Sequence, residues 1–330
     1  MIKKKVVVAG GGVLGAQIGL ISAYWGHDVT FWLRSEGSIG RTEPKIRLYS
    51  DLILKDLAQA KAFIGEPMGA YLYPHGLIRD WNGTTAQDID QLLQEGRKNF
   101  EENIHLELDM AKALNGADIV IESISEDPKR KIELYQQMKD LLPEKTILVT
   151  NTSTLLPSMF AAYTGCPERY LALHFANTIW KHNTAEIMGH PGTDPEVYNK
   201  VVEFAREIGM VPICLHKEQP GYVLNSMLVP FLKSAQALWA NDVADPKDID
   251  MTWELSTGAP AGPFKILDIV GLETAYNINQ MDPTAREEGS LAFKIGEHLK
   301  QKIDAGETGL NAGKGFYEYP GVHKGEGGAE

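Results

Sequence analysis

Short apolar runs and longer amphipathic segments alternate along the first two thirds of the chain. Apolar, often β-branched runs predict buried strands at 6–9, 29–33, 119–121, 147–149, 171–175, 185–188 and 211–215. Apolar residues spaced three or four apart predict helices at 13–25, 43–62, 86–101, 128–142 and from Pro195 to Gly209. Strands that alternate with helices are typical of a parallel sheet with right-handed crossovers. The runs at 171–175 and 185–188 lie so close in sequence that we expect them to pair antiparallel.

The pattern becomes entirely helical after a polar break at Lys217 to Gly221. Helices are expected at 223–240, 246–257, 262–280 and 290–304, followed by a mobile, glycine-rich tail from Gly321. The prediction is therefore an α/β fold: a Rossmann-type, doubly wound parallel sheet in residues 1–217 and an all-α C-terminal domain in residues 218–330.

Residues 40–105 fit this alternation least well. Between the two helices expected there, residues 65–83 mix glycine and proline with the aromatic residues Tyr71, Tyr73 and Trp81. This segment is either an ordered loop over the functional site or a surface excursion that packs on its own aromatic side chains.

Composition narrows the class of protein. The 330 residues suffice for two domains with ordinary cores, and a net charge of −12 argues against nucleic acid or an anionic membrane as partner. No apolar run reaches the roughly 18 residues of a membrane helix, and the basic start does not lead into a signal peptide. Two distant cysteines, Cys166 and Cys214, favour a reduced cytoplasmic compartment and give no metal-ligand spacing. We expect a soluble protein without a metal.

Gly10, Gly12 and Gly15 form the pattern G-x-G-x-x-G directly after the first strand and before the first helix. In that context the pattern is typical of a dinucleotide-binding loop. The glycines allow a tight turn and close helix–strand packing, and the N–H groups at Val13 and Leu14 face the cofactor pyrophosphate. The expected cofactor is NAD or NADP.

The end of the second strand bears on the choice between these cofactors. An acidic residue usually stands there to hold the ribose 2′-hydroxyl of NAD, and Leu33 occupies that position. Arg34 and Ser35 follow and suit a 2′-phosphate, which slightly favours NADP. The alternatives are that Arg34 stacks on the adenine or faces solvent, and that Glu36 or Asp28 supplies the acid.

Two residues are candidates for proton transfer. A ketone that accepts hydride becomes an alkoxide that needs a proton, and histidine serves both directions near neutral pH. His174 lies in the run 171–175, and Glu186 lies in the next apolar run, twelve residues on. If the strands pair, the carboxylate orients the imidazole as in a catalytic triad without its nucleophile. The alternative is a core histidine satisfied by a local carboxylate.

A hydroxyl-rich segment, Asn151 to Thr154, follows the strand at 147–149. Ligands of doubly wound sheets bind at the carboxyl ends of the strands. Asn151 is therefore a candidate for the cofactor site and Ser153 for a bond to the substrate oxygen. An ordinary helix cap is the alternative.

Seven stretches jointly resemble the 3-hydroxyacyl-CoA dehydrogenase family over nearly the whole chain, most of all the branch with diketoreductase and lambda-crystallin (L-gulonate dehydrogenase). They are Gly10–Gly15, ADIVIESISED (117–127), NTSTL (151–155), LHFAN (173–177), GYVLNSMLVP (221–230), GAPAGPFKILDIVGL (258–272) and GKGFYEY (313–319). The resemblance implies an NAD(P)-dependent oxidoreductase that interconverts 3-hydroxy and 3-oxo groups of a small molecule, as in fatty acid metabolism.

The resemblance also implies roles for individual residues. His174 is the acid/base and Glu186 its partner, while Ser153 and Asn225 contact the reacting oxygen. Asn177 lies near the nicotinamide. Two further positions line the cofactor site: Glu126 and Lys131. The C-terminal helices form a homodimer and close the substrate cleft.

The chain departs from the family pattern in ways that leave the substrate open. Besides the missing acid, the commoner L-H-F-F-N-P reads L-H-F-A-N-T at 173–178, which alters the acyl pocket. The segment 40–105 looks longer, and its basic residues are interleaved with acids, so it offers no clear site for the phosphates of CoA. The substrate is either a short 3-hydroxyacyl-CoA thioester such as 3-hydroxybutyryl-CoA, or a CoA-free β-keto ester, diketo acid or sugar acid.

A non-catalytic, crystallin-like cofactor-binding protein is the alternative from another class. It is disfavoured because a protein without catalysis has no physical need for the set Ser153, His174, Glu186 and Asn225.

Overall fold

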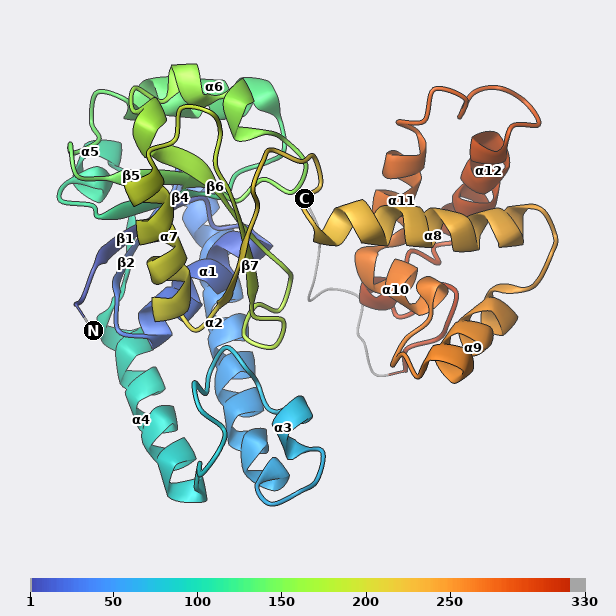
Figure 1. Cartoon of the computed structure of the whole chain (residues 1–330), viewed down its shortest axis with the longest axis horizontal. Helices are drawn as coiled ribbons and strands as arrows, with labels where there is room; N and C mark the ends of the chain where they lie inside the picture. The colour runs from blue at the N-terminus through green and yellow to red at the C-terminus, as the bar shows by residue number, and fades with distance from the viewer. Residues whose placement is uncertain (1, 321–330) are drawn as a thin grey trace. The chain divides into compact units, whose positions relative to one another are not determined.

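The computed structural model describes residues 2–320, so the tail from Gly321 lies outside the described residues (Figure 1). The chain divides into two compact units, Met1–Val223 and Leu224–Glu330, and residues 218–223 thus belong to the first unit. Within the described part, no helix combines the length and the apolar character that crossing a membrane requires.

The first unit is built on an eight-stranded sheet with the order β3-β2-β1-β4-β5-β6-β7-β8. All neighbouring strands are parallel except β6 and β7, which pair antiparallel. This confirms the expected fold class and the antiparallel pair. The strands are β1 (Lys5–Ala9), β2 (Asp28–Trp32), β3 (Ile104–Glu107), β4 (Ile119–Glu122), β5 (Ile147–Thr150), β6 (Tyr170–Phe175), β7 (Thr184–Met188) and β8 (Val211–Cys214).

Helices cover both faces of this sheet, because alternate side chains of each strand point to opposite faces. Val6 and Val8 pack in one core with α1, α2, α4 and α7, whereas Val7 and Ala9 pack in another with α5 and α6. The helices are α1 (Val13–Tyr24), α2 (Glu36–Gln59), α3 (Gly69–Leu72), α4 (Ala86–Glu102), α5 (Met110–Leu114), α6 (Pro128–Met138) and α7 (Pro195–Glu207).

Some boundaries in the first unit differ from the predictions. Helix α2 begins at Glu36 rather than near residue 43, because Ser35 caps it by accepting the N–H of Ser38. Glycines and an internal Pro44 lower the helix propensity of its first turns, which hid this start. Helix α6 ends at Met138 rather than Leu142. Strand β3 was missed because its sequence, Ile-His-Leu-Glu, contains no apolar run, and helix α5 because it has only five residues.

Helices α2 and α4 pack side by side and extend beyond the sheet as an arm (Figure 1). Within the loop between them, the ring of Tyr73 stacks between His75, at 4.1 Å, and Trp81, at 4.7 Å. The loop is tied to the body of the unit, because the N–H of Gly76 donates to the carbonyl of Trp180 at 3.0 Å. The loop thus packs on its own aromatic side chains and also contacts the segment that follows β6.

The second unit is helical, as expected. The predicted helix at 262–280 is in fact two helices, because Gly271 adopts a φ of 91° that ends the first of them. The helices are α8 (Leu224–Ala240), α9 (Pro246–Thr257), α10 (Pro263–Val270), α11 (Leu272–Asn279) and α12 (Leu291–Asp304).

A buried carboxylate explains the G-K-G-F-Y sequence near the end of the described chain. Asp268 of α10 accepts the backbone N–H groups of Phe316, at 2.8 Å, and Tyr317, at 2.9 Å. A Cβ atom on Gly315 would lie 2.0 Å from Oδ1 of Asp268, so only glycine lets the backbone come this close.

At the amino end of the sheet, the buried His27 ring accepts the N–H of Lys4 through Nδ1 at 3.2 Å. Burial lowers the pKa of His27 to about 4, against the opposing effect of the Glu207 carboxylate. Lys4 and Arg79 lower this pKa further, and Asp118 raises it. Because the unfolded side chain takes up its proton at higher pH, acid favours the unfolded chain.

We expect the free energy of unfolding to fall by about 2.5 kcal/mol through this one group between pH 7 and pH 4.5. His27→Met cannot take up a proton and should show a correspondingly smaller loss over the same range. Urea denaturation of both proteins at the two pH values measures the difference. An equal loss in both proteins would contradict the assignment.

Candidate active site

The glycine loop joins β1 to α1 with the backbone packed too closely for side chains. Gly10 adopts a φ of 117°, and a Cβ atom on it would lie 2.4 Å from the carbonyl oxygen of Ser123. A Cβ atom on Gly15 would lie 2.4 Å from the carbonyl oxygen of Gly10. The first and third glycines of the motif are therefore required by the tight turn and by helix–strand packing.

The middle glycine faces open space. A Cβ atom on Gly12 would meet none of the described atoms within 4 Å. Helix α1 begins at Val13 without a side-chain cap and with no acidic residue in its first turn. The N–H groups of Val13 and Leu14 thus start a helix that is suited to bind the negative charge of a pyrophosphate.

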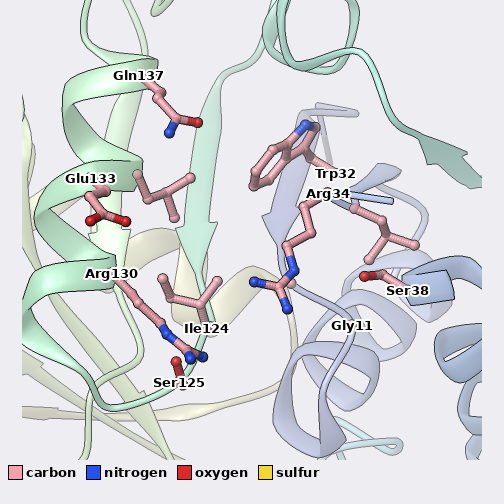
Figure 2. Close-up of a pocket in the computed structure, with 12 residues that line it drawn as sticks. Gly11, Trp32, Arg34, Ser38, Ile124, Ser125, Arg130, Glu133 and Gln137 are labelled. Atoms are coloured by element: carbon pink, nitrogen blue, oxygen red, sulfur yellow. The ribbon is translucent and has the colours of Figure 1, made fainter. Parts of the chain in front are cut away.

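A cavity of about 570 Å³ lies beside this loop, where β1 is flanked by β2 and β4. This is the switch point at which open α/β sheets bind nucleotides. Arg34, after β2, and Arg130, on α6, extend their guanidinium groups into the same space from opposite sides (Figure 2). Ser38 of α2 and Glu133 of α6 also line the cavity.

The position after β2 lacks a carboxylate that faces this cavity. Leu33 stands there and is buried. Asp28 lies at the opposite end of β2, where its Oδ1 is 3.0 Å from Nε2 of His105. Glu36 is exposed in the first turn of α2 and is not among the residues that line the cavity.

A carboxylate holds the loop after β5. Oε1 of Glu126 accepts the hydroxyl of Thr152 at 2.5 Å, the N–H of Ser153 at 2.6 Å and the N–H of Thr154 at 3.1 Å. Burial acts to raise the pKa of Glu126, but Lys131 and these hydrogen bonds outweigh it and leave the pKa below its usual range. The segment is therefore a loop clamped by an ionised carboxylate, rather than an ordinary helix cap.

Asn151 ties neighbouring strand ends together. Its Oδ1 accepts the N–H of Phe175 at 3.2 Å, and its Nδ2 lies 3.5 Å from the hydroxyl of Ser123. It thus links the ends of β5 and β6 to the segment after β4. Another predicted asparagine, Asn225, lies in the first turn of α8 and belongs to the second unit.

Beneath the clamped loop lies a buried charge network that the sequence did not reveal. Glu122, at the end of β4, is 0% exposed and accepts the ammonium of Lys131 at 2.7 and 2.9 Å. It also accepts the hydroxyls of Tyr135 and Thr150, each at 2.7 Å. Lys131 is 1% exposed, lies 3.3 Å from Glu126 between two carboxylates, and is not among the residues that line the cavity beside the glycine loop.

The register of β6 and β7 sets His174 directly opposite Glu186. Nδ1 of His174 is 2.9 Å from Oε2 of Glu186, and the two side chains are 5% and 6% exposed. Oε1 of the same carboxylate accepts the N–H of Val223 at 2.8 Å. The carboxylate can thus fix the tautomer of the imidazole and leave Nε2 as the proton-transfer atom.

An aromatic ring holds the imidazole from the side. The ring of Tyr222 stacks on that of His174 at a centroid distance of 4.7 Å and an angle of 22°. Tyr222 has a φ of 55°, unusual for a non-glycine residue, at a cost of about 1–2 kcal/mol. Burial, assisted by Glu126 and Glu186, raises its pKa far above the usual range, so the hydroxyl stays neutral. Neither the strain nor the stacking is visible in the sequence.

The turn after β6 explains one departure from the family motif. Thr178 has a φ of 59° and donates its N–H to Oε1 of Gln17 at 2.8 Å. Proline at that position could neither adopt this φ nor donate a hydrogen bond. Two residues further on, Nε1 of Trp180 donates to Asp56 of α2 at 2.7 Å. The arm therefore helps to hold the turn that follows the strand of His174.

Two models of the 3-hydroxyacyl-CoA dehydrogenase family match the chain. The NAD binding domain matches residues 78–219, and the C-terminal domain matches residues 221–319. The first match begins after the glycine loop. The assignment of that loop as a dinucleotide-binding loop therefore depends on its geometry and on relatives that match more of the chain.

Individual relatives extend over nearly the whole chain. The mitochondrial hydroxyacyl-coenzyme A dehydrogenase of Rattus norvegicus is 30% identical over 96% of this chain and 91% of its own. The 3-hydroxybutyryl-CoA dehydrogenase of Clostridioides difficile is 26% identical over 96% and 99%. A solved structure, described as "Substrate-directed dual catalysis of dicarbonyl compounds by diketoreductase", is 40% identical, covers 97% of this chain and 100% of that chain, and has a TM-score of 0.77.

The nucleotide-binding sheet and the comparisons define an oxidoreductase that acts on CH–OH groups. The chain belongs to the 3-hydroxyacyl-CoA dehydrogenase family and carries its NAD-binding domain, followed by its helical C-terminal domain.

The charge network generates a prediction about stability. Glu122→Gln removes the buried one of the two carboxylates that hold the ammonium of Lys131, and we expect the free energy of unfolding to fall by about 3 kcal/mol. Adding Lys131→Met removes the buried ammonium as well and should restore part of that loss.

Urea denaturation of the single variant, the double variant and the exposed control Glu144→Gln measures these differences. A double variant less stable than the single one, or a single variant as stable as the control, would contradict the network.

Proposed function

We propose that this protein interconverts a 3-hydroxy and a 3-oxo group of a small molecule, with His174 as the group that moves the proton. The observation that carries the proposal is the buried hydrogen bond of 2.9 Å between His174 and Glu186. His174 lies near the carboxyl end of β6, the edge of the sheet at which parallel neighbours end in the glycine loop and the loop clamped by Glu126. Ligands of such sheets bind at this edge.

The chain's own residues would act on the proton and on the reacting oxygen. A bound nicotinamide would supply the hydride acceptor for the oxidation and the hydride donor for the reduction. In the oxidation, Nε2 of His174 takes the hydroxyl proton while the C–H electron pair leaves with the hydride. In the reduction, the same atom returns the proton to the alkoxide. Glu186 stabilises the imidazolium that forms, while Ser153 and Asn225 hydrogen-bond the oxygen.

Other residues would hold this machinery in place. Glu126 fixes the backbone of Ser153, and Lys131 holds Glu126 from below rather than contacting the cofactor. Asn151 would serve the cofactor site by tying the strand ends together. The stacked ring of Tyr222 limits rotation of the imidazole.

For the substrate, we favour a CoA-free dicarbonyl or 3-oxo acid. The diketoreductase structure is 40% identical to this chain, whereas the hydroxyacyl-coenzyme A dehydrogenase relative is 30% identical. The turn at Thr178 also differs from the family's commoner motif next to the catalytic strand. A short 3-hydroxyacyl-CoA thioester, the family's namesake substrate, is the second candidate.

For the cofactor, we favour NADP over NAD. Arg34 and Arg130 supply two positive charges to the cavity beside the glycine loop, and Leu33 stands where an acid would bind the ribose. Guanidinium groups suit the doubly charged 2′-phosphate of NADP.

We also propose a homodimer that forms through the second unit, and a cytoplasmic location. Large apolar side chains lie exposed on that unit, among them Leu255 of α9 and Met281, which follows α11, each 79% exposed. Where such side chains form a contiguous patch, they are typical of an interaction surface. The location rests only on the two cysteines in the sequence, which favour a reducing compartment.

Replacement of the two catalytic residues tests the mechanism. We expect His174→Ala to lower kcat for reduction of 3-oxo substrates by about 10²–10⁴, the usual contribution of positioned proton transfer. Glu186→Gln should lower kcat by about 10² or more, because the imidazole loses its orienting charge.

Oxidation of NADPH and NADH, followed by absorbance, measures these rates with acetoacetyl-CoA and with a simple diketo ester. The exposed His216→Ala serves as control. Equal rates for wild type and His174→Ala on every substrate would end the proposal, and the ratio of rates on the two substrates ranks the substrate classes.

Replacement of Arg34 tests the cofactor assignment. Arg34→Ala should lower the affinity for NADPH about tenfold more than the affinity for NADH, because it removes a charge-assisted hydrogen bond to the 2′-phosphate, which NADH lacks. Arg130→Ala should act in the same direction, and the neighbouring, exposed Lys129→Ala should not. Fluorescence titration with each cofactor gives the affinities. An equal loss of affinity for the two cofactors would show that Arg34 does not bind the 2′-phosphate.

A further inference from the structure

Gln17 is a buried polar side chain that neither the glycine motif nor the proton-transfer pair accounts for. It lies one turn into α1, 2% exposed, and its side chain reaches the turn after β6. Its Oε1 accepts the N–H of Thr178 at 2.8 Å and the N–H of Ile179 at 3.3 Å. Its Nε2 donates to Oδ1 of Asn177 at 3.0 Å.

The backbone decides which way these amides face. A backbone N–H can only donate, so the oxygen of Gln17 must face Thr178 and Ile179, and its NH₂ group must face Asn177. The amide of Asn177 must then accept with its oxygen, which leaves its own NH₂ group directed away from Gln17. The two backbone N–H groups thus fix the orientation of the Gln17 amide and, through it, that of the Asn177 amide.

The strained turn depends on the same contact. Thr178 is β-branched and has a φ of 59°, where such residues are genuine outliers. Strain of this kind persists only where the surroundings over-determine it. Gln17 binds two successive N–H groups of the turn and donates to Asn177. Three hydrogen bonds therefore hold the amide.

We propose that Gln17 is a positioning residue that keeps the NH₂ group of Asn177 pointed outward, as a donor to an acceptor atom on the nicotinamide end of the cofactor. Asn177 is exposed and lies three residues beyond His174, at the carboxyl edge of the sheet. The inference rests on the proposed function, in which the cofactor extends along this edge from the glycine loop toward β6. It would link α1 to the cofactor a second time, indirectly through Asn177.

Gln17→Glu tests the orientation directly. The introduced carboxylate still accepts the two backbone N–H groups, but it has no donor for Asn177. Asn177 must turn its NH₂ group inward and present its carbonyl oxygen to the cofactor. We expect the affinity for whichever of NADH and NADPH binds wild type more tightly to fall about tenfold, the loss of one hydrogen bond.

Asn177→Asp supplies an independent variant at an exposed site, with no outward donor at neutral pH. This variant should bind the reduced cofactor more weakly, to a similar degree. The double variant should bind it only a little more weakly than either single variant, because both changes remove the same hydrogen bond. His182→Ala is the matched control: this exposed residue of the same turn takes no part in the hydrogen bonds of Gln17 and Asn177, and the variant should bind the cofactor like wild type.

ADP-ribose, or its 2′-phosphate, separates the possible outcomes because it lacks nicotinamide. Its affinity should be unchanged in Gln17→Glu and Asn177→Asp. The positioning role is wrong if both variants bind the reduced cofactor like wild type. It is also wrong if Gln17→Glu lowers the affinity for ADP-ribose as much as the affinity for the cofactor. In either case Gln17 only supports the fold. If wild type itself binds neither the cofactor nor ADP-ribose, the proposed function fails first.

Discussion

The antiparallel pairing of β6 with β7 places an imidazole against a carboxylate inside an otherwise parallel neighbourhood of the sheet. Side chains of a strand alternate between faces, so a shift of one residue in this register would send Glu186 to the opposite face from His174. Leu173 and Phe175 pack in the core on one face and hold the strand in register. The proton-transfer geometry is thus a consequence of how the sheet packs.

The other features of the site support that pair from three sides. The N–H of Val223 binds the second oxygen of Glu186, and the ring of Tyr222 covers the imidazole. The loop that carries Ser153 is clamped by Glu126 above a buried Glu122–Lys131 pair. Buried ion pairs add little to stability compared with apolar packing. Their value here would lie in fixing one conformation of the loop at the carboxyl edge.

Much of this architecture is predictable from the sequence because it depends on local patterns. The glycine motif is specific in its place between a strand and a helix, and the spacing of His174 and Glu186 follows from two adjacent apolar runs. Gly271, by contrast, divides a helical pattern that looks continuous, and Ser35 starts α2 in a stretch of poor helix formers. Boundaries of this kind depend on single backbone conformations.

The supporting residues are hidden from sequence for a different reason. Tyr222 and Thr178 act through left-handed backbone conformations that their residue types disfavour, and only the surrounding structure selects them. Gln17 and Glu122 contact residues far along the chain, so no local spacing marks them. The one sequence signal from which the network could have been inferred is that a charged residue, Glu122, directly follows the apolar run 119–121.

A crystal structure of the protein with its nicotinamide cofactor and a 3-oxo substrate would measure the distance on which the account depends. We predict that Nε2 of His174 lies about 3 Å from the reacting oxygen and hydrogen-bonds it directly, or that one ordered water bridges the two atoms. Nδ1 should still be bound by Glu186. An imidazole whose Nε2 faces away from that oxygen, or a carboxylate that has left the ring, would contradict the account.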